Sequence, residues 1–571
     1  MSRAAEWRFW WMQGRGRQLG LGLAFVLAIL LGSLFLAWQR ERGPSEWTIE
    51  QAVAGVQLAE GDGWSTSVNY PQTIAVLEAR DRLDFFAPQP ELHHPPLYGA
   101  LIGGCLGLLG DEGRQALLTT DARNPTAAFG GDRLLLGLNV LGLWLTAAAT
   151  FALGCWLWRP TVGVLATAAV ILSTPLWEHV VAVDGTSWLM LLSTLLLAAL
   201  AWLDRGPKLA WQIVAAVGAG AFLGLLGLGD YALLVWLPLA LVWIVWRGQG
   251  VGRWALPLVT LVAALAVLGP WWLRNLDLTG HPLGLAGQNV ALKAGDPTAD
   301  PLAIRATFEA TGLELSFRKL LHKGLAGWRE MLGSGLGGAG LFGLLALLSA
   351  VYPFQRAEVD RWRWLLLALL AAAVLVPPFL VSGLSPRSPV LYLLPGLALA
   401  GVAFFSVVLK NTRSGRPAWQ IGGVAALLVL HSLPLLHFAL EPRRLPFQYP
   451  PYFPASLQQL ATVDAQFGTR SGSVADLPAG WSWYAGGDFR VWQQPADFAQ
   501  WNRLTDYAPV HLQYFSPQLV DEQFGAALIP PPEPGWEVVY AGLATGRPPA
   551  DYPLQRVQAL PGGGLIALPD R

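Results

Sequence analysis

The sequence predicts an all-α polytopic membrane protein with about eleven transmembrane helices, followed by a small C-terminal extracytoplasmic α/β domain. Hydrophobic residues make up 53% of the chain and charged residues only 13%, whereas an ordinary soluble domain carries about 25% charged residues. Apolar runs of about 20 residues, long enough to cross a hydrocarbon core, recur as far as residue 440. After that residue the composition becomes a mixture of polar and apolar residues.

The predicted topology follows from the placement of basic residues. Arginines precede the first apolar run, residues 19–38, which lacks a small-residue cleavage site and is therefore predicted to be retained with its N-terminus in the cytoplasm. Every short loop assigned to the cytoplasm carries Lys or Arg, as expected for a bacterial cytoplasmic (inner) membrane protein. The further spans are predicted at residues 133–158, 161–177, 185–203, 209–228, 232–246, 254–273, 335–352, 364–381, 390–409 and 418–440.

Two domains are predicted. Residues 1–440 form the transmembrane domain, with long outer loops at 39–131 and 274–334; within the first loop, the apolar stretch 96–110 is too short to span and predicts an interfacial or re-entrant helix. Residues 441–571 form the soluble α/β domain, because short strands alternate with helices. The strands are predicted at 473–475, 490–492, 510–514 and 537–540, and the helices at 455–467, 497–507 and 518–524.

Charge and cysteine content exclude several classes of function. The formal net charge is zero, so no nucleic-acid partner is predicted. Cys105 and Cys155 both lie in apolar runs, which excludes a disulfide framework and a cysteine-based metal site. No metal ligands are predicted. Whether the protein uses a cofactor, such as a divalent metal, is left open.

Polar residues gather at the predicted outer ends of the spans. Carboxylates there are candidates for a general base, and arginines are candidates for binding a phosphate. The candidate catalytic residues are Glu46, Glu50 and Asp184. The candidate substrate-binding residues are His93, His94, Tyr98, Arg274, His281 and Arg387.

Structural roles stay open for several of these residues. Glu46 and Glu50 have the spacing of a solvated helix face, and the histidines before Pro95 could cap an interfacial helix. Asp184 could cap the helix that follows it. Arg387 precedes a helix start, where the helix dipole disfavours a cation, and this favours an anionic partner.

Six stretches, in order, resemble motifs of the GT-C superfamily of membrane glycosyltransferases, in the branch of protein O-mannosyltransferases and lipid A aminoarabinose transferases. The resemblance covers about residues 19–440, and 476–494 is similar to the soluble C-terminal domain of some bacterial relatives. The six stretches are 54–64 (AGVQLAEGDGW), 94–98 (HPPLY), 132–134 (DRL), 174–176 (TPL) followed by Asp184, 269–275 (GPWWLRN) with 280–282 (GHP), and 386–395 (PRSPVLYLLP).

The resemblance implies a transferase that takes a sugar from a polyprenyl-phosphate carrier and passes it to a glycan, lipid or protein acceptor. An outer-loop carboxylate would act as base, and an arginine would hold the lipid phosphate. Counted back from Gly61, the family's first-loop Asp falls at Trp47 and Thr48, so that Glu46 or Glu50 would take its role.

Two other classes of function stay open. The first is a catalytically inactive protein of the same fold, acting as a structural or assembly subunit of a membrane complex; the pair Asp230-Tyr231, where relatives often have Arg-Tyr, is compatible with it. The second is a transporter, which is less favoured because transporters place polar groups at mid-membrane, whereas here they gather at the outer ends. Membrane lipids and membrane-complex proteins are the remaining predicted partners.

Overall fold

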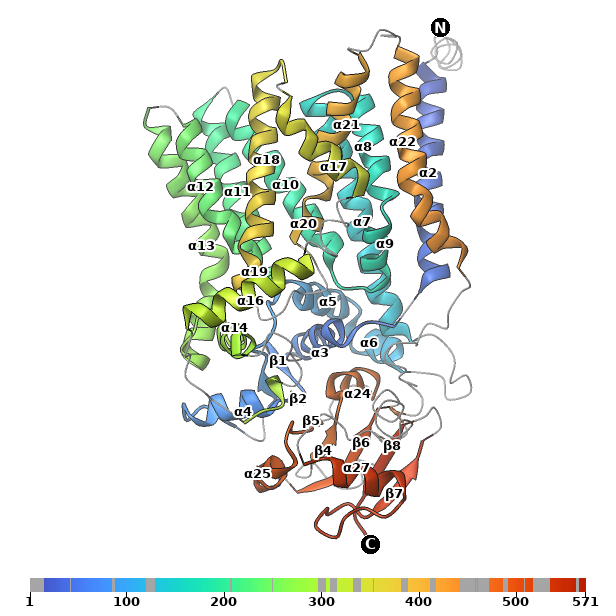
Figure 1. Cartoon of the computed structure of the whole chain (residues 1–571), viewed down its shortest axis with the longest axis vertical. Helices are drawn as coiled ribbons and strands as arrows, with labels where there is room; N and C mark the ends of the chain where they lie inside the picture. Colours follow the sequence, from blue (N-terminus) through green and yellow to red (C-terminus); the bar gives the residue numbers. More distant parts are fainter. Residues whose placement is uncertain are drawn as a thin grey trace.

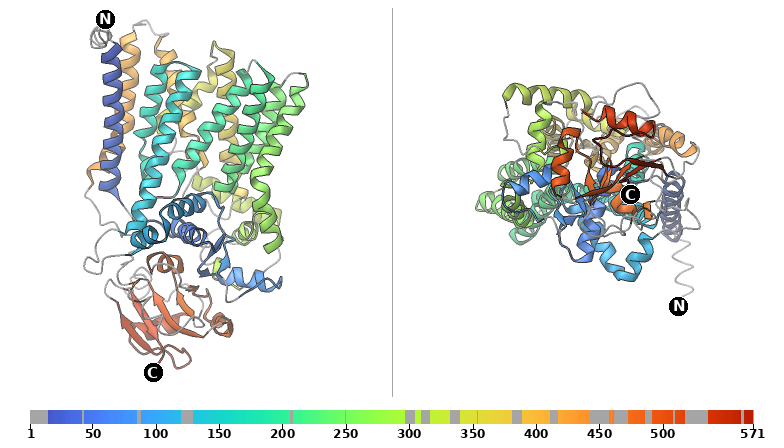
Figure 2. Two further views of the ribbon diagram at one scale, coloured as in Figure 1. Left: turned by 180° about the vertical axis from the view of Figure 1, so that it is seen from behind. Right: turned by 90° about the horizontal axis from the view of Figure 1, so that it is seen from below.

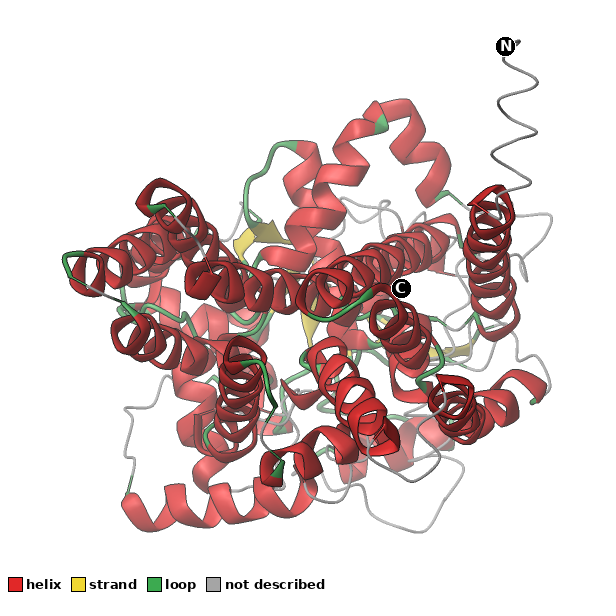
Figure 3. Cartoon of the chain, turned by 90° about the horizontal axis from the view of Figure 1, so that it is seen from above, coloured by secondary structure: helices red, strands yellow, loops and turns green. Residues whose placement is uncertain are grey.

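A computed structural model shows a bundle of helices standing side by side, with a layer of short helices and then a mixed α/β region beyond one end (Figure 1). The view from behind shows the same three layers (Figure 2), and from above the strands are visible only beneath the helices (Figure 3). The structure describes residues 15–41, 43–84, 88–119, 129–205, 208–248, 250–295, 304–308, 316–331, 340–352, 354–380, 389–410, 417–441, 457–458, 460, 472–485, 491–507, 509–516, 535–560 and 564–570.

The bundle accounts for the predicted spans. Six of the described helices are long and apolar enough to cross a membrane, and the bent pair α8 (Pro160–Ile171) and α9 (Thr174–Val181) makes a seventh. Four shorter apolar helices, at Val26–Arg40, Tyr231–Arg247, Gly340–Val351 and Leu394–Lys410, coincide with the remaining predicted spans. The main bundle helices are α2 (Arg15–Arg40), α7 (Gly130–Leu157), α10 (Thr186–Arg205), α11 (Leu209–Gly229), α12 (Trp236–Arg247), α13 (Gly252–Thr279), α17 (Gly340–Leu348), α18 (Ala357–Leu375), α21 (Leu394–Lys410) and α22 (Pro417–Leu440).

One predicted span differs in shape from the prediction. Residues 161–177 were expected to form a single helix, but α8 and α9 meet at an angle of 54°. Pro175 lies in the first turn of α9, and a proline both lacks an N–H and disfavours helical geometry in the residue before it. The break therefore has a local cause in the sequence.

The layer beneath the bundle is held together by close helix packing. The helix α3 (Glu46–Glu60) packs on α5 (Leu97–Leu108), which occupies the stretch predicted to be interfacial or re-entrant. A Cβ on Gly55 would lie 2.9 Å from the carbonyl oxygen of Gly99, and a Cβ on Gly103 would lie 2.8 Å from that of Gly55. Only glycine allows the two backbones to approach this closely. Short helices complete the layer: α4 (Pro71–Glu78), α6 (Gly110–Leu118), α14 (Ala286–Gly295), α16 (Phe317–Glu330) and α19 (Pro377–Leu380). The short helix α20 (Pro389–Tyr392) lies within the bundle, against α10, α18 and α21.

A six-stranded sheet forms the third layer, and one of its strands comes from the first loop. The strand order is β2-β5-β4-β6-β8-β7, parallel from β2 to β6 and antiparallel at β8 and β7. The predicted boundary at residue 440 stays a prediction, since β2 joins this sheet across it. The strands are β2 (Val68–Asn69), β4 (Gly472–Ala475), β5 (Val491–Gln493), β6 (Val510–Phe515), β7 (Arg556–Ala559) and β8 (Leu565–Leu568).

The local predictions for this region are partly confirmed. The strands expected at 473–475, 490–492 and 510–514 correspond to β4, β5 and β6, and α25 (Trp501–Tyr507) lies in the helix expected at 497–507. The helices expected at 455–467 and 518–524 lie wholly or largely outside the described residues. The C-terminal region also contains α24 (Pro478–Ala485), which was not expected.

The prediction of a strand at 537–540 is wrong, because these residues begin α27 (Glu537–Ala544). Val539, Tyr540 and Leu543 are buried, while Val538 is exposed. That spacing places the buried side chains on one helix face, so packing against the sheet outweighs the strand preference of Val and Tyr.

The α/β region is attached to the other two layers by two carboxylates that accept hydrogen bonds. Asp132, at the start of α7, accepts hydrogen bonds of 2.9 Å from the indole N–H of Trp483 and 2.9 Å from the hydroxyl of Tyr484. Glu46, at the start of α3, accepts a hydrogen bond of 3.1 Å from the backbone N–H of Ala479. All three donors belong to α24, which therefore connects the α/β region to α3 and α7.

We expect Asp132→Ala to lower the free energy of unfolding by about 2–4 kcal/mol, because a buried donor that loses its acceptor costs about 1–3 kcal/mol. Denaturant unfolding in detergent measures this loss, and hydrogen exchange of residues 478–485 shows whether α24 is released. Asp506→Ala, at an exposed position of α25, is the control and should change stability by no more than about 0.5 kcal/mol. Equal hydrogen exchange of α24 in both variants would contradict this role of Asp132.

Candidate active site

The candidate site is built around Glu50 on α3. The helix begins after Ser45 and ends at Gly61, whose φ of 96° closes it in the left-handed conformation. Residues 48–57 of α3 are buried, since α5 and α24 pack against the helix. Glu50 is consequently only 2% exposed, and a buried carboxylate requires compensating partners.

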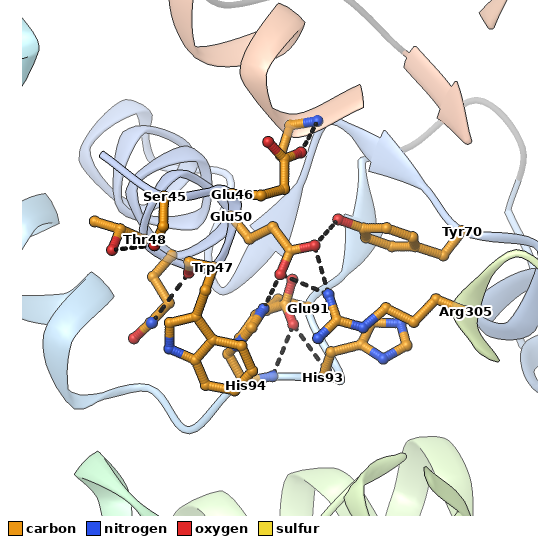
Figure 4. A network of polar contacts seen from close by, with 12 residues as sticks. Ser45, Glu46, Trp47, Thr48, Glu50, Tyr70, Glu91, His93, His94 and Arg305 are labelled. Atoms are coloured by element: carbon orange, nitrogen blue, oxygen red, sulfur yellow. Dashed lines mark hydrogen bonds and ion pairs between the residues drawn. The ribbon is translucent and has the colours of Figure 1, made fainter. Parts of the chain in front are cut away.

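Three side chains supply those partners (Figure 4). The hydroxyl of Tyr70 donates a hydrogen bond of 2.6 Å to Oε1 of Glu50. His94 Nε2 contacts Oε2, and Arg305 Nη1 contacts both carboxylate oxygens. Arg305 belongs to the second long loop and is 3% exposed. The result is a buried ion pair joined by a tyrosine and a histidine.

The charges of this network stabilise one another. Burial by itself raises the pKa of Glu50, but Arg305 and His94 outweigh burial and hold that pKa well below its ordinary value of 4.5. In the same way, Glu50 outweighs the effect of burial on Arg305 and raises the pKa of its guanidinium. Burial and the charge of Glu50 raise the pKa of Tyr70. The carboxylate and the guanidinium are therefore charged, and Tyr70 remains a neutral donor.

The turn that carries the two histidines is fixed by Glu91. Its Oε1 accepts hydrogen bonds from the backbone N–H of His93 at 2.7 Å and of His94 at 3.0 Å. His93 Nε2 lies 3.0 Å from the hydroxyl of Thr73, and burial lowers the pKa of His93. The ring of Trp47 packs edge-on against His94 with centroids 4.2 Å apart. Both imidazoles are thus held in position beside Glu50.

Arg274 donates hydrogen bonds to two backbone carbonyls of the first loop. Its Nη1 donates to the carbonyl of Glu91 at 3.1 Å and its Nη2 to the carbonyl of Trp64 at 2.7 Å. The guanidinium lies over the ring of Trp271 at 4.7 Å. β1 (Ser65–Thr66) and β3 (Gln89–Pro90) pair beside it. Arg274 therefore ties α13 to the segment that positions the histidines.

Tyr98 and Asp184 form a second, neighbouring group. The hydroxyl of Tyr98 donates to the carbonyl of Val183 at 2.8 Å and accepts from Asn139 at 2.6 Å. Gly185 has a φ of 80°, and a Cβ there would meet the ring of Tyr98 at 2.7 Å. Asp184 Oδ1 accepts from the backbone N–H of Thr186 at 3.0 Å, which caps α10.

The remaining candidates lie apart from the Glu50 network. Asp184 Oδ2 contacts His179 Nδ1 at 2.5 Å. Glu46 points toward α24 instead of toward Glu50 (Figure 4). His281 is half-buried and follows the end of α13, with its backbone N–H donating to Thr279 Oγ1 at 3.1 Å. Arg387 lies outside the described residues.

The structure thus gathers Glu50, His93 and His94, with Arg274 behind them, and adds three residues that the sequence did not single out. Tyr70 and Glu91 lie in the first loop. Glu91 comes just before the two histidines, and this position in the sequence could have indicated a structured turn. Arg305 carries no comparable signal, because its role depends on a contact across 255 residues of sequence. No group of three or more His, Cys, Asp or Glu side chains suited to a metal ion occurs in the described part of the chain.

These features define a polytopic membrane protein whose candidate site lies at one end of the bundle, between the bundle and an α/β region. No family profile matches the chain, and no curated protein is similar to it in sequence. Among solved structures, the fold is similar to that of the archaeal oligosaccharyltransferase AglB from Archaeoglobus fulgidus, in complex with an inhibitory peptide and a dolichol-phosphate. The TM-score is 0.53 at 12% identity, covering 88% of this chain and 71% of that one.

Two structures of ArnT from Cupriavidus metallidurans are also similar. The apo form has a TM-score of 0.48 at 12% identity, covering 96% of this chain and 98% of that chain. The form bound to undecaprenyl phosphate has a TM-score of 0.47 at 14% identity, covering 96% and 97%. AglB and ArnT are both GT-C membrane glycosyltransferases. The similarity to AglB confirms the predicted GT-C-like fold.

The ionised state of Glu50 has a consequence for acid stability. Below pH 4.5 the unfolded chain binds a proton at this carboxyl, whereas the folded chain keeps it charged, so that acid favours unfolding. We expect the stability due to Glu50 to be complete above pH 4.5 and to be lost as the pH falls through its lower folded-state pKa. At neutral pH, Glu50→Gln should cost about 3–5 kcal/mol, because it leaves Arg305 buried without its counter-ion.

Denaturant unfolding from about pH 7 to about pH 3 tests this, since the stability difference between wild type and Glu50→Gln should narrow on the acid side. Glu60→Gln is the matched control, because Glu60 ends the same helix, its side chain is 24% exposed, and its carboxylate lies 3.7 Å from Arg114. A constant difference between wild type and Glu50→Gln over the whole range would contradict the assignment.

Proposed function

We propose that this protein is a membrane glycosyltransferase that moves a sugar from a polyprenyl-phosphate donor to an acceptor on the outer side of the membrane. The observation that carries the proposal is the buried carboxylate of Glu50 beside the guanidinium of Arg305 and the imidazole of His94, at one end of a GT-C-like bundle. A carboxylate is the group that activates an acceptor hydroxyl, and a guanidinium is suited to a phosphate. The complex of AglB with a dolichol-phosphate supports a lipid-phosphate donor.

The proposed orientation follows from charge. At the bundle end remote from Glu50, Asp204 is paired with Arg247 at 2.6 Å and with Arg361 at 2.7 Å. Basic residues gather on the cytoplasmic side of membrane proteins. We therefore assign that end, and the N-terminus of α2, to the cytoplasm of a bacterial inner membrane. The Glu50 site and the C-terminal α/β region then lie outside the cytoplasm.

In the proposed reaction, the acceptor oxygen attacks the anomeric carbon of the sugar. The bond from that carbon to the phosphate oxygen breaks, and its electron pair leaves with the polyprenyl phosphate. The acceptor proton passes to the Glu50 carboxylate. Glu50 is a weak base while Arg305 holds it, so the donor phosphate has to take Arg305 from Glu50, which raises the basicity of the carboxylate at the moment the donor is bound.

A second candidate function is that of a structural or assembly subunit without catalysis. One observation favours it: both oxygens of Glu50 already have partners within the chain, and the carboxylate is buried. On this hypothesis, the ion pair between Glu50 and Arg305 only holds the loops in place, and the α/β region supplies the contacts to other proteins.

Single substitutions separate the two candidates. We expect Glu50→Gln to lower the rate of sugar transfer from a polyprenyl-phosphate donor by about 10²-fold or more, the usual contribution of a general base. Glu46→Gln and Asp184→Asn should retain most of the activity of correctly folded protein, because those carboxylates cap helices. Glu60→Gln is the control on α3. Full transfer by Glu50→Gln would contradict the catalytic assignment, and no transfer by wild type with any such donor would favour the subunit.

Arg305 is predicted to act on the donor. We expect Arg305→Lys to raise the KM for the polyprenyl-phosphate donor by about 10-fold or more with a smaller change for the acceptor, because an ammonium cannot reproduce bidentate phosphate binding. Arg556→Lys, at an exposed position of β7, is the control. An equal change in both KM values would argue that Arg305 only holds the loops together.

A further inference from the structure

A hollow in the bundle lies away from the candidate active site. It has a volume of about 450 Å³ and is lined by α7, α10 and α11. α10 packs against both neighbours and forms its floor. Small residues create the space, among them Ala149 on α7, Ala198 on α10 and Gly218 on α11. Since the lining is almost wholly apolar, the groove is suited to a hydrocarbon chain and not to water.

Three tryptophans line one end of this groove, one from each helix. Trp156, Trp202 and Trp211 are 38%, 45% and 53% exposed. The ring centroids of Trp156 and Trp202 are 5.6 Å apart, and those of Trp202 and Trp211 are 6.3 Å apart. Exposed tryptophans on membrane helices lie at the level of the lipid headgroups. They therefore mark where the groove meets the membrane surface.

Cations stand at the same end. Lys208 is exposed and precedes the first turn of α11, one turn before Trp211. Arg205 ends α10, with its guanidinium 5.1 Å from the ring centroid of Trp156. It also forms an ion pair of 2.8 Å with Glu358. Arg159, just beyond α7, is exposed as well. Lys208, Arg205 and Arg159 thus lie at this end of the groove, and the acid Asp204 at the same helix end is already paired with Arg247 and Arg361.

We propose that the groove between α7 and α11 binds an anionic phospholipid. One acyl chain fills the hollow over the small residues of α10, and the phosphate meets Lys208 and Arg205 at the tryptophan end. Basic pockets between membrane helices select anionic headgroups in this way. α10 connects this end to Asp184 at the other, so the lipid is separate from the proposed donor and independent of the proposed function.

The test uses the full chain in nanodiscs made of equal parts phosphatidylglycerol and phosphatidylethanolamine. After transfer to detergent, native mass spectrometry counts the phospholipids that remain bound. We expect wild type to retain one phosphatidylglycerol that Gly218→Leu does not retain. A side chain at Gly218 has room, because an added Cβ would approach only Phe222, at 3.8 Å, and it would occupy the groove.

Gly137→Leu is the matched control, because Gly137 is an exposed glycine of α7 with nothing within 4 Å of an added Cβ; it should retain the lipid. Lys208→Gln leaves the groove intact and should lower the preference for phosphatidylglycerol over phosphatidylethanolamine about fivefold. Equal retention by wild type and Gly218→Leu overturns the proposal. Retention without preference for phosphatidylglycerol in wild type, or an unchanged preference in Lys208→Gln, overturns it too.

Discussion

The buried ion pair between Glu50 and Arg305 is the interaction on which the arrangement of the loops depends. Glu50 belongs to the first loop and Arg305 to the second, and residues 304–308 also contact the α/β region. The backbone N–H of Ala496 donates to the carbonyl of Ala306 at 3.1 Å, and that of Phe308 donates to Gln500 Oε1 at 3.3 Å. A buried pair contributes little net stability, but losing one partner is costly. The pair therefore fixes which segments meet more than it stabilises the fold.

The helices around the pair leave it little freedom. Glycines bring α3 and α5 into backbone contact, and the ring of Tyr98 on α5 lies against Gly185 at the start of α10. Arg274 on α13 holds the other side of the first loop through two carbonyls. Because the bundle thus constrains the loop from two directions, the geometry of Glu50 and His94 is set by the membrane helices.

The sequence predicted what depends on local pattern. Apolar runs and flanking cations identified the spans, and Glu50, His93 and His94 were recognised because acid and histidines stand in a polar loop beside a membrane helix. Arg305 was not recognised as a site residue, because its burial depends on a contact between loops far apart in the sequence. The strand β2 was not predicted either, because it is two residues long and pairs with β5, which is far away in the sequence. At 537–540 the β-branched residues predicted a strand, but these residues form a helix because one helix face packs against the sheet.

The charges of the site also explain why donor binding and base activation would occur together. Removing Arg305 from Glu50 without a replacement leaves a buried charge uncompensated, at a cost of about 3–5 kcal/mol. A phosphate that enters beside Arg305 avoids that cost, since the guanidinium exchanges one anion for another. In the proposed reaction, transfer of the sugar turns a phosphodiester into a monoester with one further negative charge, while the acceptor proton neutralises Glu50. The total charge of the buried site would then be unchanged by the proposed reaction, and the exchange of partners on Arg305 would be the step that makes the carboxylate basic.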